Sequence, residues 1–188
     1  MVTRGLRPMD AARMHARARR AALPVLLVLA LGAACGGPAD YRPVATGDRA
    51  PDFAAATLAG DTVSLEGLRG EAVLLNIWAT WCPPCREEMP ELQALDEEYG
   101  PRGLRVVGVS IDGRGAEDAV RRFLEDYGIG FTILHDPDER VTRAFRTAGV
   151  PETFLIGRDG RVAARWIGML KPDDPTIRER IEKALAED

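Results

Sequence analysis

Two cysteines separated by two prolines, Cys82-Pro83-Pro84-Cys85, constrain this chain more than any other feature of its sequence. They lie between an apolar segment, residues 73–78, that predicts a buried strand and a segment, residues 84–99, that predicts an amphipathic helix. Cys82 is therefore expected at a helix N-terminus, where unpaired backbone N–H groups and the helix dipole favour a thiolate. Because nucleophiles are activated at such a position, we expect a redox-active pair rather than a permanent disulfide or two inert thiols.

Strands and helices alternate along most of the chain. The expected strands are residues 53–58, 62–65, 72–78, 104–111, 131–134, 153–156 and 161–167, and the expected helices are residues 84–99, 115–127, 139–146 and 173–186. Turn residues between the first two strands and between the last two predict hairpins. This order of elements indicates an α/β domain with a mixed central β-sheet that helices cover on both faces.

The first 35 residues resemble an export signal. A basic segment precedes an apolar run, residues 21–34, which is shorter than the roughly twenty residues of a membrane-spanning helix. Cys35 follows small residues, as in a bacterial lipobox, although Gly32 stands where that pattern has leucine. We expect residues 1–35 to form a lipoprotein signal with Cys35 as the lipidated residue. Cleavage after Ala34 and an uncleaved anchor at residues 21–34 are the alternatives.

Composition divides the remainder and excludes several functions. Residues 36–49 are rich in Gly, Pro and Ala and predict a flexible tether, so the folded domain is expected at residues 50–188. Without residues 1–34, which hold six arginines and one aspartate, the chain keeps 19 basic and 28 acidic side chains, a net charge of −9. Such an acidic domain is a poor candidate for binding nucleic acid, because the phosphates require a basic protein surface. Glycine-rich phosphate loops and paired zinc cysteines are absent, and three cysteines make no disulfide framework.

Several motifs around the cysteine pair point to a known family. They are Ala50-Pro51-Asp52-Phe53, Asn76-x-Trp78-Ala79-Thr80-Trp81-Cys82-x-Pro84-Cys85, Glu88-Met89-Pro90, Val107-Gly108-Val109-Ser110 and Gly149-Val150-Pro151-Glu152-Thr153-Phe154. With them the chain resembles the thioredoxin superfamily, and within it the TlpA/ResA type of membrane-tethered thiol–disulfide oxidoreductase. The resemblance implies a thioredoxin fold with an N-terminal β-hairpin, a central strand–helix insertion around residues 104–127, and electron transfer through the cysteine pair.

The two cysteines and Glu88 are the candidate catalytic residues. Cys82, at the helix N-terminus, is expected to attack a disulfide, and Cys85, one turn into the helix, to resolve the mixed disulfide. Glu88 follows Cys85 by three residues and shares its helical face, where a carboxylate could accept the Cys85 proton. The resemblance supports this role, whereas spacing alone allows an ordinary solvated acid. Asn76 is expected either to organise hydrogen bonds beneath the cysteines or to be a buried structural residue.

Substrate is expected to contact the rim of this site. Pro83 and Pro84 stiffen the loop and remove two backbone donors that could stabilise the Cys82 thiolate. Trp81 is expected at the rim, whereas Trp78 is expected in the core. The resemblance implies that Val150 and Pro151 form a cis-proline loop that offers its backbone to a substrate polypeptide; a trans proline that merely opens a strand is the alternative.

These features favour an extracytoplasmic, membrane-tethered protein-disulfide reductase. The resemblance implies a membrane thiol carrier as electron donor and exported proteins, such as apocytochrome c, as substrates. We expect no metal and no cofactor other than the Cys82–Cys85 disulfide itself. An oxidising role, a peroxidase and a Cu(I) carrier are the alternatives. The peroxidase is disfavoured because Ala79 and Leu75 stand where peroxiredoxins carry threonine and proline.

Overall fold

The computed structural model describes residues 42–171 and 173–187, and these residues contain a mixed seven-stranded sheet in the order β2-β1-β5-β4-β3-β6-β7. In chain order the elements are β1 (Ala54–Thr57), β2 (Thr62–Ser64), β3 (Ala72–Trp78), α2 (Pro83–Tyr99), the 3-10 turn η2 (Gly100–Arg102), β4 (Leu104–Ser110), α3 (Glu117–Tyr127), β5 (Thr132–His135), α4 (Arg140–Phe145), β6 (Glu152–Ile156), β7 (Val162–Ile167) and α5 (Pro175–Ala186). Strands β3, β4 and β5 are parallel, whereas β6 runs antiparallel to β3.

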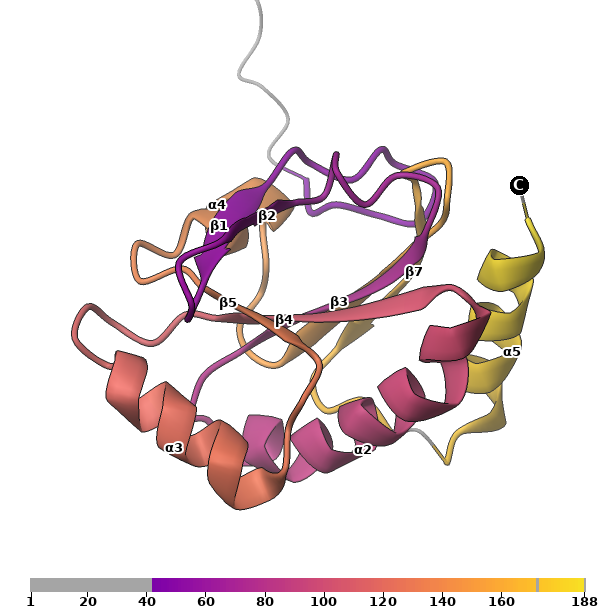
Figure 1. The fold of residues 1–188 in the computed structure, drawn as a ribbon. Coiled ribbons are helices and arrows are strands. Elements are labelled where there is room, and N and C mark those ends of the chain that lie inside the picture. The colour runs from indigo at the N-terminus through magenta and orange to yellow at the C-terminus, as the bar shows by residue number, and fades with distance from the viewer. Residues whose placement is uncertain (1–41, 172, 188) are drawn as a thin grey trace, which may run out of the picture. The chain divides into compact units, whose positions relative to one another are not determined.

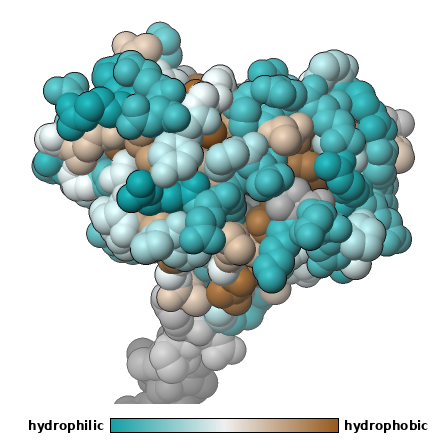
Figure 2. Space-filling model, turned by 90° about the horizontal axis from the view of Figure 1, so that it is seen from below, coloured by the Kyte–Doolittle hydropathy of each residue, from teal (hydrophilic) through white to brown (hydrophobic). Residues whose placement is uncertain are grey.

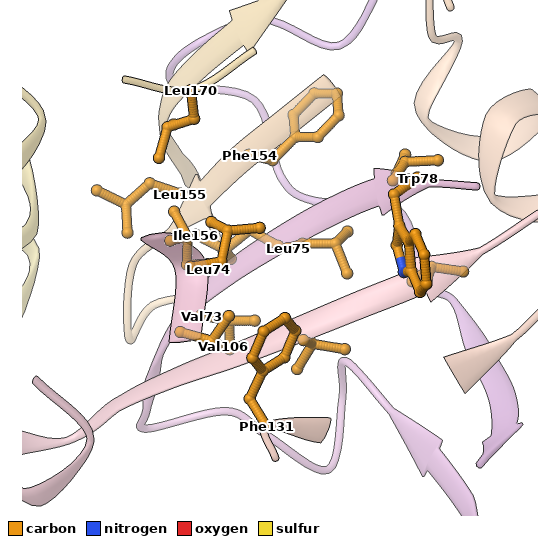
Figure 3. Close-up of a cluster of buried hydrophobic side chains, with 14 of the residues drawn as sticks. Val73, Leu74, Leu75, Trp78, Val106, Phe131, Phe154, Leu155, Ile156 and Leu170 are labelled. Atoms are coloured by element: carbon orange, nitrogen blue, oxygen red, sulfur yellow. The ribbon is translucent and has the colours of Figure 1, made fainter. Parts of the chain in front are cut away.

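The central strands carry the core. All seven residues of β3 are buried, and its sequence is nearly continuous in apolar residues because side chains on both faces are covered. Figure 3 shows Leu74 and Leu75 of this strand packed with Phe154 and Leu155 of the neighbouring β6. The end of β3 is thereby fixed, and the cysteine pair follows only a few residues later.

Helices cover both faces of the sheet. Figure 1 shows α2 and α3 on one side of the strands and α4 on the other. Helix α5 lies beside α2, and Arg178 of α5 donates a hydrogen bond to Glu98 of α2. Most charged side chains are exposed, and Figure 2 shows a surface that is mostly hydrophilic. Within residues 42–171 and 173–187, no helix is long and apolar enough to cross a membrane.

The predicted α/β fold with a mixed sheet covered on both faces is confirmed, and every expected strand and helix is present. Their ends differ by up to two residues, as expected where helices and strands fray. The expected insertion at residues 104–127 corresponds to β4 and α3, which lead into β5, the parallel neighbour of β4.

The domain begins earlier than the composition predicts. Residues 42–49, expected in the tether, pack along the β6–β7 hairpin: Gly47 N donates to Val162 O at 2.8 Å, and Val162 N donates to Asp48 O at 2.9 Å. Arg165 also donates to the Val44 carbonyl at 3.1 Å. Backbone pairing orders most of this segment, and Val44 is its one apolar side chain packed against the core, so its composition does not predict an ordered segment. The predicted signal at residues 1–35, with Cys35, and the tether up to residue 41 lie outside the described residues.

A glycine in the middle of β4 makes room for Trp78. A Cβ atom on Gly108 would lie 2.8 Å from Ile133 Cδ1 and 3.0 Å from Trp78 Nε1. The fully buried indole lies across this bare backbone and packs on Phe123 of α3, with ring centroids 5.1 Å apart. Gly108 therefore lets α3 close over the strand that leads to the cysteines.

We expect Gly108→Ala to lower the free energy of unfolding by about 1–3 kcal/mol, because the added methyl group overpacks the core. Urea denaturation of the oxidised protein would measure this. Gly113→Ala is the matched control, since its Cβ would meet no atom within 4 Å, and it should change the free energy of unfolding by less than about 0.5 kcal/mol. Equal effects of the two substitutions would contradict the packing argument.

Candidate active site

The cysteine pair forms a disulfide at the start of α2. Cys82 is the N-cap residue, Pro83 and Pro84 occupy the first turn, and the two Cα atoms of the cysteines are 5.3 Å apart. Cys85 is completely buried, whereas 3% of Cys82 is exposed. Both prolines beside them are exposed. The outer sulfur thus belongs to Cys82, as a nucleophile that must meet a second protein requires.

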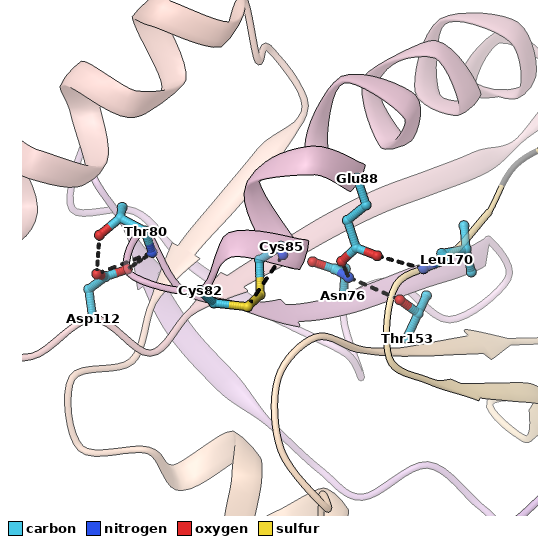
Figure 4. The surroundings of a disulfide bond; sticks show 8 residues. All are labelled: Asn76, Thr80, Cys82, Cys85, Glu88, Asp112, Thr153 and Leu170. Carbon is cyan, nitrogen blue, oxygen red and sulfur yellow. Dashed lines mark hydrogen bonds between the residues drawn. A yellow bond between two sulfur atoms is a disulfide. The ribbon is translucent and has the colours of Figure 1, made fainter.

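The helix end offers few donors to Cys82. The Cys85 backbone N–H donates to Cys82 Sγ at 3.3 Å (Figure 4). Pro83 and Pro84 have no N–H, so the Cys85 amide is the first along the helix that can stabilise a Cys82 thiolate. The reduced form is therefore less stabilised than it would be at a helix end with three free amides. Limited stabilisation of the thiolate favours a reducing couple.

Glu88 is buried behind the disulfide. Its side chain lies inside the protein with 1% of the residue exposed, which excludes the solvated acid that spacing alone allowed. Asn76 Nδ2 donates to one carboxyl oxygen at 2.8 Å, and the Leu170 backbone N–H donates to the other at 2.7 Å. Burial raises the pKa of Glu88 to about 7, although the two hydrogen bonds oppose the shift. A carboxyl group with this pKa can both accept and release a proton near neutral pH.

Asn76 connects the strands beneath the helix. It lies on β3 opposite Thr153 of β6, and its Nδ2 also donates to Thr153 Oγ1 at 2.9 Å. Its Oδ1 is buried without a hydrogen-bond partner among the described residues. Rotation of the amide would present this acceptor to a protonated Glu88. Asn76 therefore does organise polar contacts at the site.

Two partners of this network escaped the sequence analysis. Thr153 carries a signal, since it lies in the motif that follows Pro151, but a threonine in a strand is too common to single out. Leu170 carries none, because its contribution is a backbone N–H in the connection between β7 and α5. Only the tertiary fold brings this amide to Glu88.

The groups predicted to contact substrate lie at the same end of the sheet. The Val150–Pro151 bond is cis, as the resemblance implied, and Gly168 N donates to Pro151 O at 2.9 Å. The β3–β6 register pairs Ile77 with Glu152, which brings Pro151 level with the end of β3. Trp81 is 63% exposed beside the disulfide, whereas Trp78 is buried in the core, as expected.

A groove of about 480 Å³ leads from the surface to Glu88. Its lining includes Glu87 and Glu91 of α2 and Met169 and Leu170 of the connection before α5. Within the part of the chain that the structure describes, no group of three or more His, Cys, Asp or Glu side chains is arranged to hold a metal ion.

Comparison with known proteins identifies the family. The AhpC/TSA family model matches residues 46–165, which is more than half of the chain. The chain belongs to this family. Within the family it is similar to the thiol-disulfide oxidoreductase ResA of Bacillus thuringiensis, at 32% identity over 150 residues that cover 77% of this chain and 86% of the relative. ResA of Oceanobacillus iheyensis is 36% identical over 138 residues, 71% of each chain.

Solved structures of the family agree with this assignment. A thiol:disulfide interchange protein from Chlorobium tepidum is 29% identical, with a TM-score of 0.63 over 78% of this chain and 99% of that chain. A candidate DsbE from the same organism reaches a TM-score of 0.70 at 33% identity, over 76% of this chain and 99% of that chain. The family resemblance predicted from the sequence is confirmed: the chain is a thiol–disulfide oxidoreductase of the ResA/DsbE-like type.

Proposed function

We propose that this protein is an extracytoplasmic, membrane-tethered reductase of disulfides in exported proteins. The observation that carries the proposal is the buried Glu88, one turn of α2 after the resolving cysteine, whose pKa burial raises to about 7. The Cys82 thiolate bonds to one substrate sulfur, and the other substrate sulfur leaves as a thiolate. Cys85 then transfers its proton to Glu88 and attacks Cys82, which releases the second substrate sulfur and forms the disulfide seen in the structure.

The helix end favours the reducing direction, and the N-terminal sequence favours an extracytoplasmic location. The prolines leave only the Cys85 amide to stabilise the Cys82 thiolate from the helix end, which disfavours the reduced form and makes it a better electron donor. The apolar run at residues 21–34 and Cys35 favour export and membrane attachment by a lipid or an N-terminal anchor. In an oxidising compartment the dithiol has to be regenerated by a thiol–disulfide carrier in the membrane. Apocytochrome c, with its paired cysteines, is the substrate that the family resemblance favours.

Partner trapping with Cys85→Ser tests this proposal. Without the resolving thiol, Cys82 should remain bonded to its substrates. Mixed disulfides should therefore accumulate in the native membrane and be cleaved when a reductant is added. The double variant Cys82→Ser/Cys85→Ser is the control and should trap nothing. We expect exported proteins with paired cysteines among the trapped species. An absence of mixed disulfides, with peroxide turnover faster than disulfide turnover, would support the peroxidase; stoichiometric Cu(I) binding without disulfide reduction would support the copper carrier.

A further inference from the structure

Asp112 is a second buried carboxyl group next to the cysteine loop, and the exchange chemistry above does not use it. Only 2% of the residue is exposed. It follows β4, whose last residue, Ser110, pairs with Trp78 at the end of β3, and Ile111 N donates to Trp78 O at 2.9 Å. Because the two parallel strands end at the same edge, Asp112 lies beside Thr80, two residues before Cys82.

The Asp112 carboxylate is held by donors from the cysteine loop and from its own strand. The Thr80 backbone N–H donates to Oδ2 at 3.0 Å, and the Thr80 hydroxyl donates to Oδ1 at 2.5 Å. The Ser110 hydroxyl donates to Oδ2 at 2.8 Å. Both oxygens are thus supplied with donors, as an ionised carboxylate requires. These contacts fix the backbone of the loop immediately before Trp81 and Cys82.

Within the described part of the chain, the Asp112 carboxylate has polar donors but no ion-pair partner. Among the described residues, no arginine or lysine forms an ion pair or hydrogen bond with Asp112. Asp136 and Glu152, two further buried carboxylates at this end of the sheet, differ in this respect, because Asp136 pairs with Arg140 at 3.0 Å and Glu152 pairs with Arg165. In Figure 4 the disulfide lies between the Thr80–Asp112 contact and the Asn76–Glu88 contact. The site is therefore flanked by two carboxyl groups with different surroundings.

We propose that Asp112 is a positioning residue that fixes the cysteine loop through Thr80 and that its uncompensated negative charge disfavours the Cys82 thiolate, which makes the dithiol a stronger electron donor. A buried charge acts over several ångströms because little water screens it. Destabilising the thiolate destabilises the reduced protein, and the equilibrium shifts toward the disulfide. The proposal rests on the proposed reductase function, since a strong electron donor is what that function needs.

Other ionisable side chains surround the same end of the sheet, and the test leaves them unchanged. They are Arg86 and Glu88 of α2, Glu117 of α3 with His135 of β5, Asp136 with Arg140 of α4, and Glu152 of β6 with Arg165 of β7. His135 Nε2 contacts the Asp112 carbonyl oxygen at 2.8 Å rather than its carboxylate, so the side-chain substitution does not remove this contact.

The test compares Asp112→Asn with Thr80→Val in the purified full chain. Asp112→Asn removes the charge, and its amide can still pair with the two hydroxyls. Thr80→Val keeps the charge but removes one of its donors. As a general scale, two unit charges roughly 10 Å apart at an effective dielectric constant of about 20 change an equilibrium about tenfold. We expect Asp112→Asn to shift the dithiol–disulfide equilibrium against glutathione, measured at a pH where Cys82 is ionised, by about tenfold toward the dithiol, or about 30 mV. At neutral pH, Cys82 of this variant should react faster with iodoacetamide.

Thr80→Val should shift both quantities in the opposite direction or leave them unchanged. A purely structural role of the contact predicts the same direction for both variants, and that result would overturn the proposal, as would an unchanged equilibrium in Asp112→Asn. If Asp112→Asn does not fold, Ser110→Ala joins Thr80→Val as a variant that keeps the charge and removes a donor. Faster alkylation of Cys82 in these two variants would then overturn the proposal, and slower or equal alkylation would support it. The glutathione equilibrium needs no protein substrate, so its outcome is independent of whether the proposed substrates are reduced.

Discussion

Cys82→Ser should lower the rate of protein-disulfide reduction by at least about a thousandfold, because a serine hydroxyl is not ionised near neutral pH and cannot replace the thiolate as a nucleophile. The structure supports Cys82 as the attacking residue, since it caps α2 and its sulfur receives the Cys85 amide hydrogen. Insulin reduction, with dithiothreitol as electron donor, would measure the loss. The variant should also form no mixed disulfide with a substrate.

The matched comparison is Cys85→Ser, which keeps the nucleophile and loses the resolving thiol. It should react once with a substrate and stop at the mixed disulfide, so it differs from Cys82→Ser in the trapped product although both lose turnover. Turnover in both single variants would contradict the two-cysteine mechanism. Mixed disulfides in Cys82→Ser but not in Cys85→Ser would reverse the roles of the two residues.

Glu88→Gln should slow resolution of the mixed disulfide by about a hundredfold and remove its dependence on pH near 7. In the natural chain the rate of this step should rise with pH as Glu88 loses its proton, because only the carboxylate can accept the Cys85 proton. Quenched-flow measurement of the step between pH 5.5 and 8.5 would show both effects. Glu87→Gln is the control, since Glu87 is the exposed neighbour on the same helix and should change neither the rate nor its pH profile.

Glu88 should also make the free energy of unfolding depend on pH, and Glu88→Gln should remove this dependence. The pKa of Glu88 is about 7 in the folded, oxidised protein and near the ordinary value of 4.5 when the chain is unfolded, so between these values the folded state binds more protons. The free energy of unfolding must therefore fall as pH rises through this range, by at most about 3 kcal/mol from this group. Glu88→Gln should lose this decline, because its amide is neutral and can pair with Leu170 N–H and a rotated Asn76.

Urea denaturation of the oxidised natural chain and of Glu88→Gln between pH 4 and pH 8 would test this sign. The difference between the two curves should grow with pH in favour of the variant and level off above pH 7. A difference that is constant with pH would contradict a raised pKa at Glu88. The comparison cancels the contributions of surface carboxylates such as Asp48, whose pKa is lowered by Arg42 and which therefore stabilise the fold as pH rises at lower values.

Much of the architecture is predictable because it depends on local patterns. Burial on both faces makes β3 continuously apolar, and the helix that follows repeats its apolar side chains every three to four residues. The start of the domain was less predictable. Residues 42–49 are held by backbone hydrogen bonds and by Arg165, which reaches the Val44 carbonyl, and neither contact leaves a pattern in composition.

The sequence by itself determined the reaction. Two thiols three positions apart between a buried strand and a helix end can exchange disulfides in any fold that forms those two elements, because spacing and helix position are local properties. Only the tertiary structure decided what tunes them. The pKa of Glu88 depends on its burial and on the amide of Leu170, and the charge near Cys82 depends on Asp112 from the end of a neighbouring strand. Burial and electrostatic fields are sums over residues that are distant in the sequence, so they exist only once the chain has folded.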